Sequence, residues 1–239
     1  MLLAANKDPI GSALLDYLET GKDIPIEVKL DIAEDDTLLP SYFFRSYEQC
    51  PELEQIALQQ ARGKVLDVGA GAGSHSLYLQ QQGLDVTAID VSPASVDVMR
   101  KRGIKNVLLA DFYDDREGQF DTLMFLMNGI GLVQTLDSFD EFFSRVKKLL
   151  APHGQVLLDS SDLIYMFEEE DGSYLIDIND KYHGEVIFNL AYKNISGDPF
   201  NWLYVSEELL QDAAEANGFD FEVVKQGPHY DYLAKLTLA

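Results

Sequence analysis

The chain has 239 residues, 46% hydrophobic and 25% charged, which is typical of a globular protein with a buried core and excludes a disordered or low-complexity chain. A single cysteine, Cys50, excludes a disulfide scaffold, and neither a leader peptide nor an apolar membrane-spanning run is evident, so we expect a cytoplasmic protein. The net charge of −23 disfavours nucleic acid and anionic membranes as partners and mildly favours neutral or cationic small molecules.

Residues 1–63 are expected to form a lead-in segment that covers a site. Asp8 followed by Pro9 is typical of a helix N-cap and first turn, and predicts a helix to about Thr20. Apolar residues then alternate with other residues over 24–32, which indicates a half-buried strand. A second helix is predicted over 51–61 and ends at Gly63.

Residues 64–162 alternate short apolar runs with helical stretches. Strands separated by helices indicate βαβ units, and therefore a parallel sheet with helices on both faces. The expected strands are 64–68, 84–89, 106–110, 122–127 and 155–158, and the expected helices are 74–82, 92–102 and 139–150.

The remaining residues differ in pattern. Residues 163–205 are expected to be an insertion that contains a β-hairpin over 185–205 and serves as a lid or a dimer contact. The strand near residue 28 is a candidate partner for this hairpin. The pattern over 206–239 predicts a helix capped by Ser206, followed by an antiparallel pair of strands that closes the core.

A glycine-rich turn, from Gly69 to Gly73, follows the first strand of the alternating region. Glycines allow a tight turn against which a ligand can lie, and the next helix offers free N–H groups. Asp90 ends the second strand 21 residues after Gly69, where an acidic side chain reaches both hydroxyls of a ribose. A dinucleotide fingerprint would require Gly or Ala at Ser74, and the acidic pair Asp67 and Asp90 suits a sulfonium compound better than a pyrophosphate.

Several motifs in order extend this observation. They are DVGAGAG at 67–73, AIDVS at 88–92, LADF at 109–112 and FDT at 120–122, with a fourth strand that ends at 127–129. The set resembles that of the class I S-adenosylmethionine (SAM) dependent methyltransferases over residues 64–162. The resemblance implies an α/β, Rossmann-like fold: a seven-stranded, mostly parallel sheet with a reversed final strand, to which the small antiparallel insertion is added.

The resemblance also implies roles at the methionine end of SAM. Asp67 would lie near this end, with Gly69 and Gly71 against it, and Asn128 would face the position of methyl transfer. Arg45, in an aromatic lead-in stretch that also fits core packing, could pair with the SAM carboxylate.

For the adenosine end, the resemblance implies that Asp90 accepts hydrogen bonds from the ribose and that Val91 packs on the adenine. Asp111 would accept from the adenine amino group, and Phe112 would contribute its backbone N–H or its ring. Each has a structural alternative: Asp111 fits a turn cap, Val91 fits plain packing, and Phe112 fits the core equally well.

Methyl transfer from a sulfonium needs alignment and exclusion of water more than a catalytic motif. Asn128 and His75 are the catalytic candidates, although His75 also fits a first-turn helix residue without a role. Tyr42, Arg45 and Asp159 are candidates for substrate binding, with Asp159 placed after the fifth strand. No metal site is expected.

The favoured function is a SAM-dependent methyltransferase that acts on a small molecule, as a monomer or homodimer. Asn128 is followed by Gly129 rather than by the Pro-Pro-aromatic sequence of relatives that methylate base amino groups, which also disfavours nucleic acid. The alternatives are a non-catalytic SAM-binding module and, less favoured, an NAD-dependent oxidoreductase.

Overall fold

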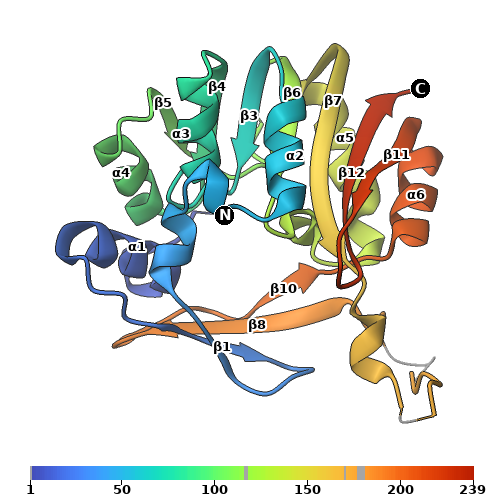
Figure 1. Ribbon diagram of the computed structural model, residues 1–239, viewed down its shortest axis with the longest axis horizontal. Helices are drawn as coiled ribbons and strands as arrows, with labels where there is room; N and C mark the ends of the chain where they lie inside the picture. Colours follow the sequence, from blue (N-terminus) through green and yellow to red (C-terminus); the bar gives the residue numbers. More distant parts are fainter. Residues whose placement is uncertain (1, 116–117, 170, 177–180) are drawn as a thin grey trace.

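The computed structural model describes residues 2–115, 118–169, 171–176 and 181–239, and its main body is a seven-stranded sheet (Figure 1). The strand order is β11-β12-β7-β6-β3-β4-β5. The five strands from β7 to β5 are parallel, and β12 runs antiparallel to β7, which confirms the predicted mostly parallel sheet with a reversed final strand. The strands are β3 (Lys64–Val68), β4 (Asp85–Asp90), β5 (Asn106–Leu109), β6 (Phe120–Phe125), β7 (Leu150–Ser161), β11 (Phe219–Gln226) and β12 (Asp231–Leu238).

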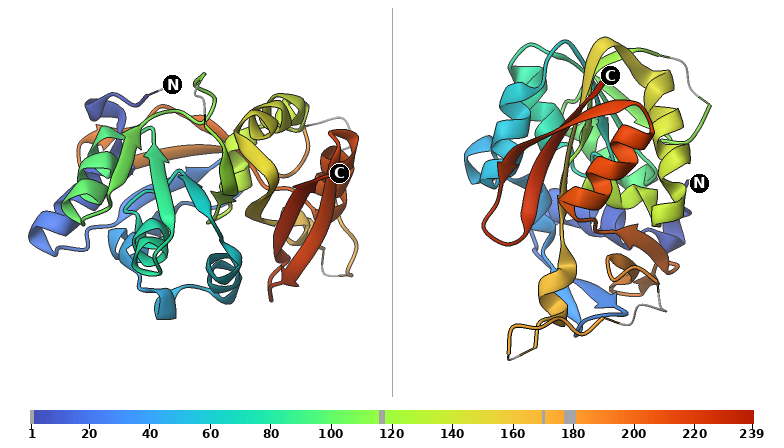
Figure 2. Two further views of the ribbon diagram at one scale, coloured as in Figure 1. Left: turned by 90° about the horizontal axis from the view of Figure 1, so that it is seen from above. Right: turned by 90° about the vertical axis from the view of Figure 1, so that its right-hand side faces the viewer.

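Helices cover both faces of this sheet, as predicted. On one face the strands pack against α2 (Glu52–Gln60), α3 (Ser74–Gln81) and α4 (Pro93–Lys101). On the other they pack against α5 (Phe139–Leu149) and α6 (Glu207–Ala216), and Figure 2 shows α2 and α3 on the side opposite α5. Both faces of the central strands are therefore buried, which explains their nearly continuous apolar runs. No described helix combines the length and apolar character needed to cross a bilayer.

A second, antiparallel sheet lies beyond the ends of the parallel strands (Figure 1). Its strand order is β10-β8-β1-β2, and Val28 pairs with Leu190, which confirms that the strand near residue 28 joins the hairpin. The helix α1 (Pro9–Thr20) packs on this sheet and is capped by Asp8, as predicted. The strands are β1 (Ile26–Leu30), β2 (Asp36–Leu38), β8 (Glu185–Tyr192), β9 (Ile195–Ser196) and β10 (Phe200–Leu203), of which β2 was not predicted.

Two predicted strand ends are wrong, and both matter for the site. β7 runs to Ser161, so Asp159 lies inside the strand instead of following it, because Leu233 of β12 pairs with Asp159 and prolongs the ladder. β6 ends at Phe125, and the backbone then turns sharply through Met127 (φ 63°) and Asn128 (φ 56°). The expected insertion at 163–205 lies partly outside the described residues, and its role as a lid or dimer contact stays a prediction.

Candidate functional site

The glycine-rich turn connects β3 to α3 at the carboxyl end of the parallel strands. Gly69, Gly71 and Gly73 have φ angles of 69°, 56° and 77°, a region that L side chains rarely adopt. A Cβ at Gly69 would have no heavy atom within 4 Å, whereas one at Gly73 would lie 2.2 Å from Cδ1 of Ile104. The turn thus leaves open space above Gly69, while Gly73 allows close packing against Ile104.

Asp90, the last residue of β4, is hydrogen-bonded to this turn. Its Oδ2 accepts a hydrogen bond from the Gly71 N–H at 2.8 Å, and its Oδ1 accepts one from the Ser92 N–H at 2.8 Å. Burial raises the pKa of Asp90 to about 6; the two backbone bonds oppose the shift, and the charges of Asp8 and Asp67 add to it. Each carboxylate oxygen keeps a further lone pair, so the group can accept additional hydrogen bonds.

Asp67 is almost completely buried, with an exposed fraction of 2%. Its Oδ2 accepts a 2.6 Å hydrogen bond from the Ser76 hydroxyl, which ties β3 to α3. Burial raises the pKa of Asp67, and the charge of His75 opposes this shift. The carboxylate that the resemblance placed near the methionine end is therefore engaged with a neighbouring helix.

The lead-in segment lies against the glycine turn. It contains the 3-10 helix η2 (Pro40–Phe44), and Cδ1 of Phe43 lies 3.5 Å from the position a Cβ would take at Gly71. The Ser74 hydroxyl, at the start of α3, donates to the Phe43 carbonyl at 2.7 Å. The open space above the turn is thus bounded on one side by residues that precede the first core strand.

A buried group of charged side chains lies between α2 and α3. Glu54 Oε2 is 2.6 Å from His75 Nε2, and both oxygens of Glu54 are 2.9 Å from Arg45 Nη2. Burial would raise the pKa of Glu54, but the bond to His75 and the charges of His75 and Arg45 hold it below its ordinary value. Burial opposes a charge on His75, yet bonds with Cys50 and Glu54 and the charge of Asp67 raise its pKa well above the ordinary value. This direction favours the protonated, cationic form of His75.

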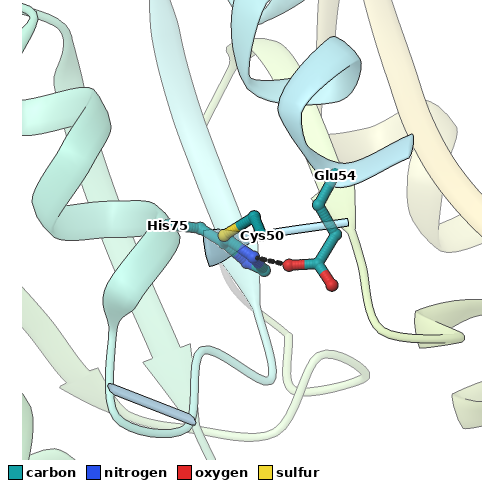
Figure 3. Close-up of side chains that lie close together, drawn as sticks. All are labelled: Cys50, Glu54 and His75. Atoms are coloured by element: carbon teal, nitrogen blue, oxygen red, sulfur yellow. Dashed lines mark hydrogen bonds and ion pairs between the residues drawn. The ribbon is translucent and has the colours of Figure 1, made fainter. Parts of the chain in front are cut away.

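Cys50, Glu54 and His75 are also metal-ligand residue types that lie together (Figure 3). Their candidate ligand atoms are within 4.8 Å of one another. The Arg45 guanidinium, however, already lies beside both oxygens of Glu54 and places a positive charge where a cation would bind. We therefore interpret the group as an ion-pair network.

Glu54 was not predicted as a site residue, although the sequence carries a signal for its burial. Glu54 is 4% exposed on the side chain and shares the buried face of α2 with Leu53, Ala57 and Leu58. An acidic residue at such a helical spacing must be paired or protonated in the folded protein, because burying an isolated charge is costly.

A cavity of about 170 Å³ lies at the same edge of the sheet. It brings together Tyr42, Asn128 and Asp159, three residues that were predicted separately from the sequence. Arg45 and His75 lie behind it, bonded to Glu54 in its wall. The remaining lining residues are Pro51, Leu53, Met127, Ser160, Ser161 and Asp231.

Asn128 and Asp159 are held in this cavity by backbone contacts. Asn128 Nδ2 donates to the Leu203 carbonyl at 3.2 Å, and the Asn128 carbonyl accepts from the Trp202 indole at 3.0 Å. Asp159 Oδ1 accepts a long, 3.4 Å bond from the Gly129 N–H. Burial, together with the charge of Glu54, raises the pKa of Asp159 to about 7.

The residues expected at the adenine all make contacts within the protein that match their structural alternatives. Asp111 Oδ1 accepts a hydrogen bond from the Tyr113 N–H at 3.0 Å, which is the turn-capping contact considered for it. The Phe112 ring packs in the core, 5.2 Å from that of Phe125. Val91 is half-buried, and its carbonyl accepts from the Leu3 N–H at 2.9 Å.

Residues 66–158 match the family model described as a methyltransferase domain. The chain is 45% identical to a SAM-dependent methyltransferase from Bacteroides fragilis, crystallised with S-adenosyl-L-homocysteine, over 100% of this chain and 98% of that one, with a TM-score of 0.95.

Curated relatives are more distant. The putative methyltransferase YqeM of Bacillus subtilis is 28% identical over 145 residues, which cover 54% of this chain and 58% of the relative. The magnesium-protoporphyrin O-methyltransferase of Rhodobacter capsulatus is 25% identical over 146 residues, 59% of this chain and 50% of the relative. The matched region thus spans between 50% and 58% of the length of these two relatives.

Proposed function

The chain belongs to the SAM-dependent methyltransferase family, and from this premise we propose that it transfers a methyl group from SAM to a nucleophilic atom of a small molecule. The full-length likeness to a relative bound to S-adenosyl-L-homocysteine supports SAM as the methyl donor. When bound, SAM supplies a methyl carbon on a sulfonium, whose leaving group is a neutral thioether.

The open glycine turn is the observation that carries this proposal. The backbone at Gly69 faces space that no side chain fills. The carboxylate of Asp90, bonded to the same turn, has lone pairs that are available for further hydrogen bonds. This arrangement fits a ribose against the carboxylate and a methionyl group along the bare main chain. Asp67, Val91, Asp111 and the Phe112 N–H keep the roles that the resemblance implies, as part of the proposal.

Arg45 provides a second sign of fit to SAM. Its Nε and Nη1 are buried and lack a hydrogen-bond partner among the described residues, while Nη2 is bonded to Glu54. A buried donor without a partner costs about 1–3 kcal/mol. The carboxylate of a methionyl group is an anion of suitable chemistry to satisfy these donors.

The size and charge of the cavity favour a small acceptor. About 170 Å³ beside Asn128 accommodates a modest organic group, and the net charge of −23 repels phosphate backbones. The described side chains would hold the acceptor in line and exclude water, which is the main requirement for displacement at a sulfonium carbon.

Calorimetry with S-adenosyl-L-homocysteine, SAM and NAD tests the proposal. We expect binding of the first two but not of NAD. Asp90→Ala should weaken binding about 100-fold, because two hydrogen bonds to a charged group are lost. Asp97→Ala, whose side chain is 62% exposed on α4, is the matched control and should bind normally. Binding of NAD but not of SAM, or an unchanged affinity of Asp90→Ala for S-adenosyl-L-homocysteine, would contradict the proposal. If the protein binds SAM but methylates no acceptor, it is a SAM-binding module and not an enzyme.

A further inference from the structure

We propose that the methyl acceptor is an amine that enters the cavity as an ammonium ion, and that Asp159 binds it and takes its proton. This inference rests on the proposed methyl transfer and names the acceptor class of the same site. Its support comes from the charges that line the cavity, from the surroundings of Asp159 and from a second unpartnered acceptor.

The charge of the cavity wall has one sign. Among the described lining residues, the ionisable groups are Tyr42 and the carboxyl groups of Glu54, Asp159 and Asp231, and neither lysine nor arginine contributes. Glu54 is already neutralised by Arg45 and His75 behind the wall. The surface of the cavity therefore offers no lysine or arginine, among its described lining residues, to an anionic acceptor, whereas its carboxyl groups would attract a cation.

Asp159 is half-buried in this wall, and no cation among the described residues bonds to its carboxyl group. The interactions given for its carboxyl group are backbone N–H bonds from Gly129 and Asn128, the first of them long at 3.4 Å. The charged and titratable groups that face it are Glu54 from α2, His75 from α3, Asp231 at the start of β12 and Tyr204 after β10. Only His75 among them is a cation, and it is already bonded to Glu54.

The ionisation of Asp159 suits proton exchange. Burial and the charge of Glu54 raise the pKa of its carboxyl group to about 7, so that the group both loses and gains a proton near neutral pH. An approaching ammonium ion favours the ionised form, and transfer of its proton leaves a neutral acid beside a neutral amine.

Asn128 offers a second acceptor for the same ligand. Its Oδ1 is buried and has no partner among the described residues, and its residue lines the cavity next to Asp159. Met127 and Asn128 both have positive φ angles, a strained arrangement that often occurs at functional sites. An ammonium ion carries several N–H donors, so it can bond to both Asp159 and Asn128, which an ether or alkyl group cannot do.

The ammonium gives one proton to the Asp159 carboxylate, and the neutral amine nitrogen uses its lone pair to form a bond to the methyl carbon. The bond from that carbon to sulfur breaks, and its electron pair stays on the neutral thioether. The product is an N-methylammonium ion, and the proton on Asp159 passes to solvent after the product leaves.

Matched probes test the inference on the intact protein saturated with S-adenosyl-L-homocysteine. Cyclohexylamine, cyclohexanol and cyclohexanecarboxylate share a skeleton and differ in charge, and benzylamine, benzyl alcohol and benzoate form a second set. We expect calorimetry to show that each amine binds at least tenfold more tightly than its alcohol and carboxylate. Amine affinity should also fall about tenfold per pH unit below pH 7, as Asp159 is protonated.

Asp159→Asn keeps the size of the side chain and removes its charge. We expect this variant to bind S-adenosyl-L-homocysteine as the wild type does, and to lose amine binding by about 30-fold along with its pH dependence. Asp212→Asn, an exposed position on α6, is the control and should behave as wild type. Equal binding of alcohols or carboxylates, or undiminished amine binding in Asp159→Asn, would overturn the inference. Failure of the wild type to bind S-adenosyl-L-homocysteine would instead count against the proposed function.

Discussion

Glu54 Oε2 lies 2.6 Å from His75 Nε2, and the same carboxylate also contacts Arg45, so one buried anion holds two cations. Asp67 adds a second anion near His75, which brings the network close to neutrality. The network joins the lead-in segment, α2 and α3 directly behind the cavity wall. It therefore fixes the lead-in against the core at the place where we propose that the acceptor binds.

Removal of the Glu54 carboxylate should lower the stability of the folded protein. Glu54→Gln removes the one anion that contacts both Arg45 and His75 and leaves Asp67 as the remaining acidic group near His75. We expect the free energy of unfolding to fall by about 3 kcal/mol or more. Glu52→Gln removes an exposed carboxylate of the same helix, 70% exposed and 3.3 Å from Nζ of Lys225 in β11. This change should alter the free energy of unfolding by less than about 1 kcal/mol. Urea denaturation of both variants measures the contrast, and similar losses would show that Glu54 is not a structural ion partner.

The same network should make stability depend on pH with a definite sign. The pKa of His75 is raised from its ordinary 6.5, so its contribution is complete below that pH and declines as the pH rises above it. The pKa of Glu54 is held below 4.5, so its contribution is complete above that pH and is lost as the pH falls further.

His75→Gln isolates the first of these effects. The difference in unfolding free energy between wild type and His75→Gln should be largest near pH 6 and should shrink steadily toward pH 10. Denaturant titrations at several pH values give this difference directly. A difference that grows with rising pH would mean that His75 is neutral in the folded protein.

Local sequence patterns were enough to predict the parallel core. Strand and helix periods, and caps such as Asp8 and Ser92, depend on neighbours in the chain, and both residues do accept hydrogen bonds from their own helices. The spacing of Gly69 and Asp90 likewise placed the two residues at one sheet edge, because consecutive parallel strands end there. The period of two over 24–32 likewise indicated β1, whereas its pairing with β8 was only a candidate until the ladder between Val28 and Leu190 confirmed it.

Features that depend on distant partners were not predicted. Asp159 lies within β7 only because β12 pairs with it from the far end of the chain. The burial of Glu54 depends on the approach of Arg45 and His75, and the contact of Trp202 with Asn128 joins positions separated by 74 residues. None of these contacts leaves a local pattern, so the surroundings of Asn128 and Asp159 could not be predicted from the sequence.

Close packing beside the cavity gives another prediction. A Cβ at Gly131 would lie 2.0 Å from Nε1 of Trp202, whose indole donates to the Asn128 carbonyl. Gly131→Ala must displace the indole, and we expect a loss of about 1–3 kcal/mol in unfolding free energy and weaker binding of the acceptor.

The double variant Gly131→Ala/Trp202→Ala checks the cause. If the indole is the obstacle, the second substitution removes the clash, and the two losses should be less than additive in a double-mutant cycle. Additive losses in denaturant titrations would show that Gly131 is needed for another reason.

Asp90 should make cofactor affinity depend on pH. The side chain of Asp90 can accept hydrogen bonds from both ribose hydroxyls only when it is ionised. Burial, together with the charges of Asp8 and Asp67, raises its pKa to about 6 in the free protein. Below pH 6 a growing share of molecules must lose a proton before they bind. We therefore expect the Kd for S-adenosyl-L-homocysteine to rise about tenfold per pH unit between pH 6 and pH 4.5, and to be flat above pH 7.

Calorimetry over this range measures the trend, and Asp90→Asn should bind weakly with no break near pH 6. A break that persists in Asp90→Asn would have to come from another buried carboxyl group, with Asp67, whose pKa burial also raises, as the next group to substitute.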